Sequence, residues 1–179
     1  MSIVDHASAV VRFYRGQGRD QSGRTLDEIV QWDDGALEDV HDFIQWLFPL
    51  NEASGANWNA PILTPDDIQA FHRDDALRGA LRRSLIRMLA FYGFELRGDG
   101  ESVSIGRGPG WAARSRNWLT PVNHNHLRLT RIMKSLSLLG VPELARALQA
   151  ALLTEAAAAG TSVISSTTVR YWKSAVESD

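Results

Sequence analysis

Apolar residues recur at helical spacing along most of the chain. When segments 36–47 and 125–139 are placed on helices, at about 100° per residue, apolar side chains fall on more than one side of each. Helices of this kind are buried from two directions, so we expect both near the centre of the fold. His41 lies on the apolar arc of the first segment, where a histidine is most often a core residue with hydrogen-bonded ring nitrogens.

Start and stop signals divide the rest of the chain into further helices. Thr25 and Glu28 have the spacing of a capping box, and Thr64 followed by proline is a strong helix start. The predicted helices are 26–32, 64–72, 76–92, 143–159 and 169–176. Weak alternation is confined to residues 94–105 and predicts one small β-hairpin. The pattern therefore predicts a mainly α, single compact multi-helix domain over residues 1–179.

Composition narrows the classes of function. The chain has 179 residues, 44% of them hydrophobic, and no cysteine, which excludes disulfides, thiolate metal sites and cysteine nucleophiles. No apolar run approaches the roughly 18–20 residues of a membrane helix, and no signal peptide opens the chain, so we expect a cytoplasmic protein without a membrane partner. Phosphate-loop, dinucleotide and nucleophile-elbow motifs are absent. The sequence thus assigns no catalytic residue, metal or cofactor.

Charge is balanced overall but not along the chain. Residues 1–75 carry 14 acidic and 5 basic side chains, whereas residues 76–150 carry 4 acidic and 12 basic ones. We expect the two blocks to neutralise each other by packing together. Arginine, which makes up 17 of the 19 basic residues, suits such pairing with carboxylates. The alternative is a basic face for an anionic partner such as nucleic acid, which is less favoured.

Six tryptophans are many for this length, and most stand near loops or helix ends. Together with nearby arginines they could line a groove for a peptide or a small ligand. The candidate ligand-binding residues are Trp32, His41, Trp46, Trp58, Trp118, His124, His126 and Arg128. The alternative interpretation is that the tryptophans anchor loops onto the core.

A second class of function is an enzyme or a metal protein. It would use His41, His124 and His126 with Asp33 or Asp34. Two histidines separated by one residue diverge by about 200° on a helix, so a metal would need ligands from elsewhere. Capping of the next helix explains the two aspartates equally well. Catalysis is therefore the less favoured interpretation.

Particular strings carry a family resemblance. The most specific is Ile44-Gln45-Trp46-Leu47-Phe48-Pro49-Leu50, and Asn123-His124-Asn125-His126-Leu127-Arg128-Leu129 is another. Over residues 11–142 the chain resembles the conserved region of the opioid growth factor receptor family, with helices 143–179 expected to pack on that core. The resemblance implies an all-helical domain and, in animals, binding of the pentapeptide Met-enkephalin in a growth-inhibitory nuclear pathway. It transfers no binding residues.

The resemblance and the tryptophans together predict a non-enzymatic ligand-binding domain. Its ligand would be a peptide or other small molecule, with the natural ligand and the oligomeric state left open. The arginine- and alanine-rich composition is typical of a bacterial homologue.

Overall fold

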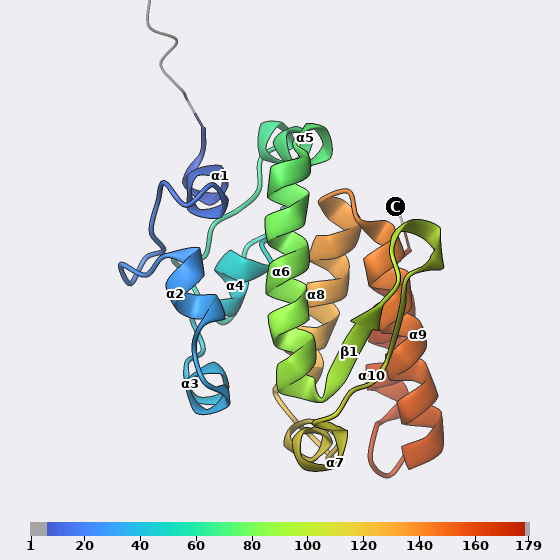
Figure 1. The fold of residues 1–179 in the computed structure, drawn as a ribbon. Helices are drawn as coiled ribbons and strands as arrows, with labels where there is room; N and C mark the ends of the chain where they lie inside the picture. The colour runs from blue at the N-terminus through green and yellow to red at the C-terminus, as the bar shows by residue number, and fades with distance from the viewer. Residues whose placement is uncertain (1–6, 178–179) are drawn as a thin grey trace, which may run out of the picture. The chain divides into compact units, whose positions relative to one another are not determined.

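The computed structural model describes residues 7–177, which form ten α-helices and one two-stranded antiparallel sheet (Figure 1). The mainly helical fold class is confirmed. The chain divides into two compact units, Met1–Arg83 and Ser84–Asp179, and helix α6 (Asp75–Tyr92) runs through the boundary. No helix within residues 7–177 is both long enough and apolar enough to cross a membrane.

The first unit is built from short helices joined by polar loops. They are α1 (Ala9–Tyr14), α2 (Leu26–Val30), α3 (Asp34–Asp39), α4 (Ile44–Leu47) and α5 (Pro65–Arg73). The Thr25 hydroxyl accepts from the backbone N–H of Glu28, whose carboxylate accepts from the backbone N–H of Thr25. Thr64 and Asp67 form the same reciprocal pair before α5. The predicted capping signals therefore set the starts of both helices.

The prediction of one continuous helix over residues 36–47 is wrong. α3 ends before Val40, which adopts an extended conformation (φ −87°, ψ 128°), and α4 begins only at Ile44. The break lets each half bury its own apolar side chains, with Leu37 and Phe43 both fully buried. One continuous helix over residues 36–47 would have placed apolar side chains on several of its sides. His41 consequently lies in the connection and is exposed, not part of a core arc.

Polar side chains tie two loops of the first unit together. The Trp46 indole N–H donates to Gln21 Oε1 at 3.2 Å, and the Asn57 amide N–H₂ donates to the same oxygen at 3.2 Å. Arg24 pairs with Asp42 at 2.8 Å in the same neighbourhood. The loops before α2 and after α4 are therefore held by a hydrogen-bonded network instead of by apolar packing.

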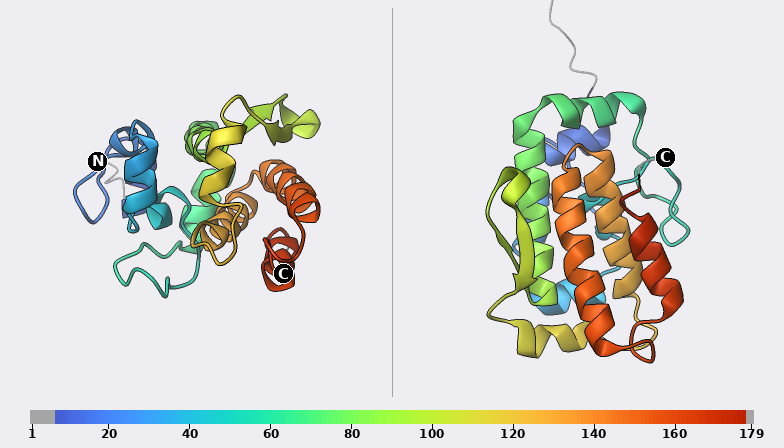
Figure 2. Two further views of the ribbon diagram at one scale, coloured as in Figure 1. Left: turned by 90° about the horizontal axis from the view of Figure 1, so that it is seen from below. Right: turned by 90° about the vertical axis from the view of Figure 1, so that its right-hand side faces the viewer.

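The second unit is a helical layer with a hairpin on its edge. After α6 come β1 (Phe94–Arg97), β2 (Ser104–Arg107), α7 (Trp111–Arg114), α8 (Asn125–Leu138), α9 (Pro142–Ala159) and α10 (Ser166–Ser174). α8, α9 and α10 lie side by side, and α9 also packs on β2 (Figure 2). The strands pair from Phe94 with Arg107 to Arg97 with Ser104, so the predicted hairpin is confirmed and extends two residues further.

The helix predicted at 125–139 is confirmed in its position as α8. Its burial from two directions is only partly correct. Leu129, Ile132, Met133 and Leu136 are buried, but Leu127 in the first turn is 73% exposed. Leu127 is exposed because it faces a pocket beside the start of α8, which is described below.

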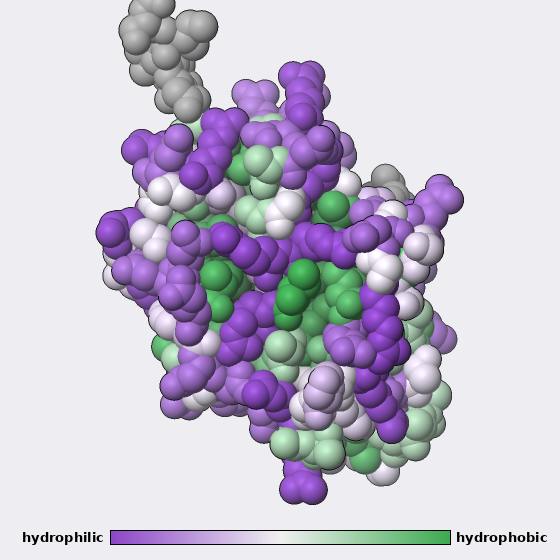
Figure 3. Space-filling model, in the orientation of Figure 1, coloured by the Kyte–Doolittle hydropathy of each residue, from purple (hydrophilic) through white to green (hydrophobic). Residues whose placement is uncertain are grey.

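Many arginines of the basic block are engaged within the unit to which they belong. In the first unit Arg78 donates to the Phe71 carbonyl at 2.7 Å, and Arg83 pairs with Asp27 at 2.6 Å. In the second unit Arg107 forms a bidentate ion pair with Glu155, in which Nε donates to Oε1 at 2.9 Å and Nη2 donates to Oε2 at 2.8 Å. On the face shown in Figure 3, hydrophilic residues cover most of the surface, with hydrophobic residues in smaller areas between them. Of the three contacts named, only Arg83–Asp27 is an ion pair between the acidic block and the basic block, so the mutual neutralisation of the two blocks stays a prediction.

Gly93, which ends α6, offers a test of the local backbone. Its φ is +91°, and a Cβ there would approach the Trp111 Cα to 3.0 Å. We expect Gly93→Ala to lower the free energy of unfolding by about 1–3 kcal/mol, measured by urea titration. Gly100→Ala is the control, because that glycine also has a positive φ but a methyl group added to it would meet nothing within 4 Å. Equal losses for the two variants would contradict the steric part of the argument.

Candidate functional site

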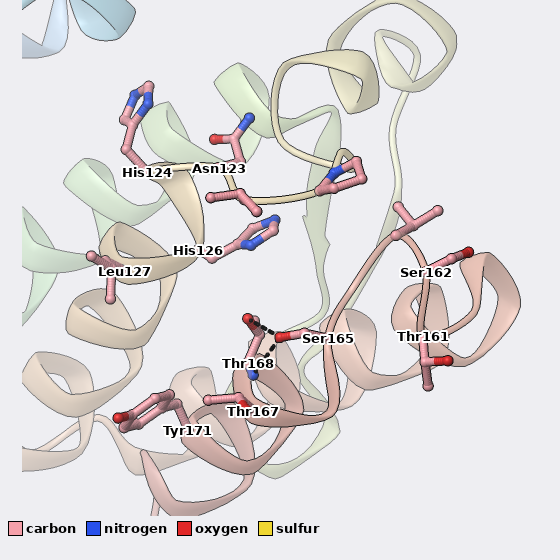
Figure 4. Close-up of a pocket in the computed structure, with 13 residues that line it drawn as sticks. Asn123, His124, His126, Leu127, Thr161, Ser162, Ser165, Thr167, Thr168 and Tyr171 are labelled. Atoms are coloured by element: carbon pink, nitrogen blue, oxygen red, sulfur yellow. Dashed lines mark hydrogen bonds between the residues drawn. The ribbon is translucent and has the colours of Figure 1, made fainter.

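A hollow of about 500 Å³ lies in the second unit between the start of α8 and the start of α10 (Figure 4). We call it the His126 pocket. Its lining residues are Pro121, Val122, Asn123, His124, His126, Leu127, Thr161, Ser162, Val163, Ser165, Thr167, Thr168 and Tyr171. One wall comes from the loop before α8 and the first turn of that helix, and the other from the loop after α9 and the first turns of α10. The volume lies within the range of small-ligand sites.

The imidazole of His126 reaches into this pocket (Figure 4). Its Nε2 lies 2.7 Å from the Trp118 carbonyl oxygen. A carbonyl oxygen can only accept, so Nε2 carries the proton and Nδ1 of the neutral ring carries a lone pair. Among residues 7–177, Nδ1 has no hydrogen-bond partner, and no buried side-chain nitrogen or oxygen is left unsatisfied. Nδ1 is therefore open to the pocket as an acceptor.

Burial lowers the pKa of His126 below its ordinary value, because a charged ring is poorly solvated there. The hydrogen bond to the Trp118 carbonyl favours the protonated ring and offsets part of this shift. The ring is consequently neutral at pH 7. It offers a ligand one hydrogen-bond acceptor and no charge.

Two buried indoles pack behind His126, outside the pocket lining. The Trp172 ring meets the His126 ring edge to face, with 5.7 Å between centroids, and its N–H donates to the His126 backbone carbonyl at 3.3 Å. Trp118 lies 6.4 Å from Trp172 and donates its own N–H to the Tyr92 carbonyl at 2.9 Å. The position of the imidazole is thus fixed by its packing against Trp172 and by the hydrogen bond from Nε2 to the Trp118 carbonyl.

Val122, at the rim, has a strained backbone. Its φ is +49°, a left-handed conformation that is rare for a β-branched residue, and its side chain is fully exposed. The next residue holds the loop in place: the Asn123 amide N–H₂ donates to the Asn117 carbonyl at 2.8 Å, and its oxygen accepts from the backbone N–H of Asn125 at 2.9 Å. Strain of this kind concentrates at functional sites.

The remaining lining is apolar or hydroxylic. Leu127 and Tyr171 are exposed hydrophobic side chains, 73% and 58% accessible. The Ser165 hydroxyl caps α10 by accepting from the backbone N–H of Thr168 at 3.1 Å, and it also donates to the hydroxyl of Thr168 (Figure 4). No carboxylate, lysine or arginine lines this pocket.

Within residues 7–177, no group of three or more histidine, aspartate or glutamate side chains could hold a metal ion. The side chain of His124 points away from His126, as expected for two histidines at this spacing where a helix begins (Figure 4). Asp33 accepts from the backbone N–H of Ala36 at 2.8 Å and so caps α3. The capping role that the sequence offered for Asp33 is thus confirmed.

Half of the candidate residues taken from the sequence lie in the second unit. His124 and His126 line the pocket, and Trp118 lies behind it. Arg128 is buried one turn along α8, 3.4 Å from Asn125 Oδ1. No tryptophan or arginine lines the His126 pocket, so the Trp/Arg groove that we expected is not found there. Its walls consist of apolar and hydroxyl side chains with histidine, asparagine and tyrosine.

The other candidates lie in the first unit and in different surroundings. Trp46 is buried, and Trp32 is half-buried with the Arg24 guanidinium 5.2 Å from its ring centroid. Trp58 is 95% exposed on the loop between α4 and α5. The first two rings match the alternative interpretation, in which tryptophans anchor loops, whereas Trp58 has its ring in solvent.

Sequence reasoning misses the second wall of the pocket. The sequence predicts only linker and helix cap over residues 161–168, yet six of them line the hollow, as does Tyr171 further along. The six are Thr161, Ser162, Val163, Ser165, Thr167 and Thr168. The density of serine and threonine there is the one signal that could have pointed to this wall. It is ambiguous, because the same residues favour helix caps and turns.

The fold and the pocket define a small, mainly α-helical protein with a hollow whose polar centre is one oriented imidazole. The sequence pattern described as the opioid growth factor receptor (OGFr) conserved region matches residues 5–179. The chain therefore belongs to the opioid growth factor receptor family, as its strings indicated.

Curated relatives bear the same family name. The chain is 42% identical over 123 residues to the opioid growth factor receptor of Rattus norvegicus, covering 67% of this chain and 21% of the relative. It is 41% identical over 133 residues to that of Homo sapiens, covering 72% and 19%. It is 36% identical over 137 residues to the opioid growth factor receptor-like protein 1 of Mus musculus, covering 73% and 28%. The match thus spans between 19% and 28% of the length of these relatives. No solved structure matches.

The lowered pKa of His126 gives a testable pH dependence. Since the folded state holds this proton less tightly than the unfolded state, the unfolded state binds more protons as pH falls below about 6.5, and stability falls with it. We expect His126→Gln, which keeps an N–H donor for the Trp118 carbonyl, to lose less stability than the unaltered protein between pH 7.5 and 5.5. Urea unfolding at several pH values measures this.

His41→Gln, at an exposed position, controls for the loss of a histidine as such. It should follow the unaltered protein across the same pH range. An NMR titration in which the His126 ring protonates above pH 6.5 would contradict the assignment.

The strain at Val122 predicts a stabilising substitution. Val122→Asn places a residue that tolerates the left-handed conformation at a fully exposed position, so we expect the free energy of unfolding to rise by about 0.5–1 kcal/mol. Val122→Thr is the matched control at the same exposed position, because threonine is also β-branched and gains nothing in the left-handed conformation. A Val122→Asn variant less stable than the unaltered protein by urea unfolding would show that no strain is relieved.

Proposed function

We propose that this chain is a non-enzymatic ligand-binding domain that takes a peptide or other small ligand in the His126 pocket. The observation that supports it most directly is the open Nδ1 of a neutral, oriented imidazole in a hollow of about 500 Å³. Ligand sites of this type combine mostly apolar walls with a few polar groups that fix orientation. The name of the relatives, receptors, agrees with binding.

Peptides suit this chemistry. Each peptide unit carries an N–H that can donate to Nδ1 of His126. Apolar side chains of the peptide can cover Leu127 and Tyr171, which are otherwise exposed to solvent. The hydroxyls of Thr161 and Ser162 at the opposite wall can pair with peptide carbonyls. The pocket therefore offers a short peptide hydrogen-bond partners for its backbone and apolar contacts for its side chains.

A binding role is also favoured over catalysis by the state of the nearby hydroxyls. Ser165 and Thr168 bond to each other and to the start of α10. A nucleophile requires a hydroxyl within hydrogen-bond reach of a base. In the described pocket no hydroxyl is hydrogen-bonded to His126, whose bonded ring nitrogen is engaged with a backbone carbonyl.

The proposal is tested by NMR with ¹⁵N-labelled protein, using Met-enkephalin and a pool of random tripeptides as probes. We expect amide shifts to change at residues 121–127 and 161–171. Leu127→Glu, which puts a charge into the apolar wall at an exposed position, should weaken binding at least tenfold.

Ala157→Glu is the matched control, because it adds the same charge at an exposed position of α9 outside the pocket lining. It should bind like the unaltered protein. Absence of binding by every probe, or shifts that cluster away from the two pocket walls, would overturn the proposal.

A further inference from the structure

A second, smaller hollow continues the His126 pocket along α10. It measures about 250 Å³ and is lined by Thr167, Arg170, Tyr171 and Ser174. These residues have the i, i+3, i+4, i+7 spacing of one helix face. Thr167 and Tyr171 line both hollows, so the two form one groove.

Arg170 is the cation of this groove. Its guanidinium lies 3.4 Å from the Thr167 hydroxyl oxygen, and no described aspartate or glutamate within residues 7–177 forms an ion pair with it. Elsewhere in the same unit Arg107 and Arg97 each have a carboxylate partner. Among residues 7–177, Arg170 thus has no carboxylate partner, and the lining of the two hollows contains no acidic residue.

Resting on the function proposed above, we propose that the groove binds a short peptide by its free carboxyl terminus, with the carboxylate on Arg170 and an upstream peptide N–H on His126 Nδ1. A planar guanidinium donates two parallel N–H bonds to a carboxylate. Because the Thr167 hydroxyl accepts from Arg170, its own O–H is available to donate to the same carboxylate. One arginine and one hydroxyl suit a monoanion, whereas phosphate groups are usually met by several cations.

The middle of the groove gives the peptide its apolar contact. Tyr171 lies between the two ends, since it lines both hollows, and its ring is 58% exposed. Leu127 stands on the facing wall. The last side chain of the peptide would be placed between these two, so an apolar residue is expected there. The structure therefore specifies direction as well as class: the carboxyl end lies along α10 and the preceding residues lie toward α8.

The test compares two pools of random tripeptides with apolar last residues, one with free carboxyl ends and one as carboxyl-terminal amides. Binding to the full chain is measured by NMR titration at pH 7.5. We expect the free acids to bind about tenfold more tightly than the amides. In Arg170→Gln this preference should disappear, and Arg170→Lys should restore part of it.

Lys173→Gln is the matched control, because it removes an exposed positive charge from α10 at a position that lines neither hollow. It should keep the preference for free acids, which separates a local contact from the general field of the helix. Equal binding of acids and amides to the unaltered protein would overturn this inference and leave the proposed function standing. Absence of binding by both pools would overturn the two together.

Inorganic phosphate is added as a competitor in the same titration. Little displacement of the free-acid peptides at equal concentration supports the carboxylate assignment. Strong displacement by phosphate, together with shifts confined to residues 167–174, would show an anion site of another kind and contradict it.

Discussion

The second unit depends on the hydrogen bonding of one buried residue, Trp118. Its indole N–H donates to the end of α6 at Tyr92, and its carbonyl accepts from His126 at the start of α8. Its ring meets Phe94, Trp111 and Trp172 at centroid distances of 5.6, 6.0 and 6.4 Å. A single side chain with its backbone thus connects α6, the hairpin, α7, α8 and α10. Truncating its side chain would leave a large void and take the indole donor away from the Tyr92 carbonyl.

The same residue determines the chemical character of the pocket. By accepting from Nε2, its carbonyl fixes which nitrogen of His126 is protonated and which is offered to a ligand. Packing against Trp172 then prevents the ring from turning. An acceptor held in this way loses little conformational entropy when a ligand binds, which is the condition for a small site to be selective.

Much of the fold could be predicted from local sequence signals, and part of it could not. The capping residues Thr25 and Thr64, and Gly93 after α6, mark helix ends because their chemistry acts within a few residues. The break at Val40 escapes detection because periodicity alone does not show that two short arcs pack better than one long helix. The advantage lies in tertiary packing, which local patterns do not contain.

Part of the candidate site, too, could be predicted from the sequence, and part could not. His124 and His126 stand out as residue types with chemical use, and both line the pocket. Tyr171 and the segment 161–168 do not, because their role depends on α10 lying beside α8 through the contact of Trp172 with His126. That contact joins residues 46 positions apart in the chain. No composition or spacing argument could have brought them together.

The contrast between Trp58 and the pair Trp118 and Trp172 has an optical consequence. An indole almost wholly in water emits at long wavelength, whereas indoles sealed in a protein interior emit at short wavelength. A protonated imidazole quenches a neighbouring indole, and Trp172 touches the ring of His126. Protonation of the imidazole therefore dims the share of the short-wavelength emission that comes from Trp172, to which the buried Trp118 and Trp46 also contribute, while the long-wavelength edge reports on the loop that carries Trp58.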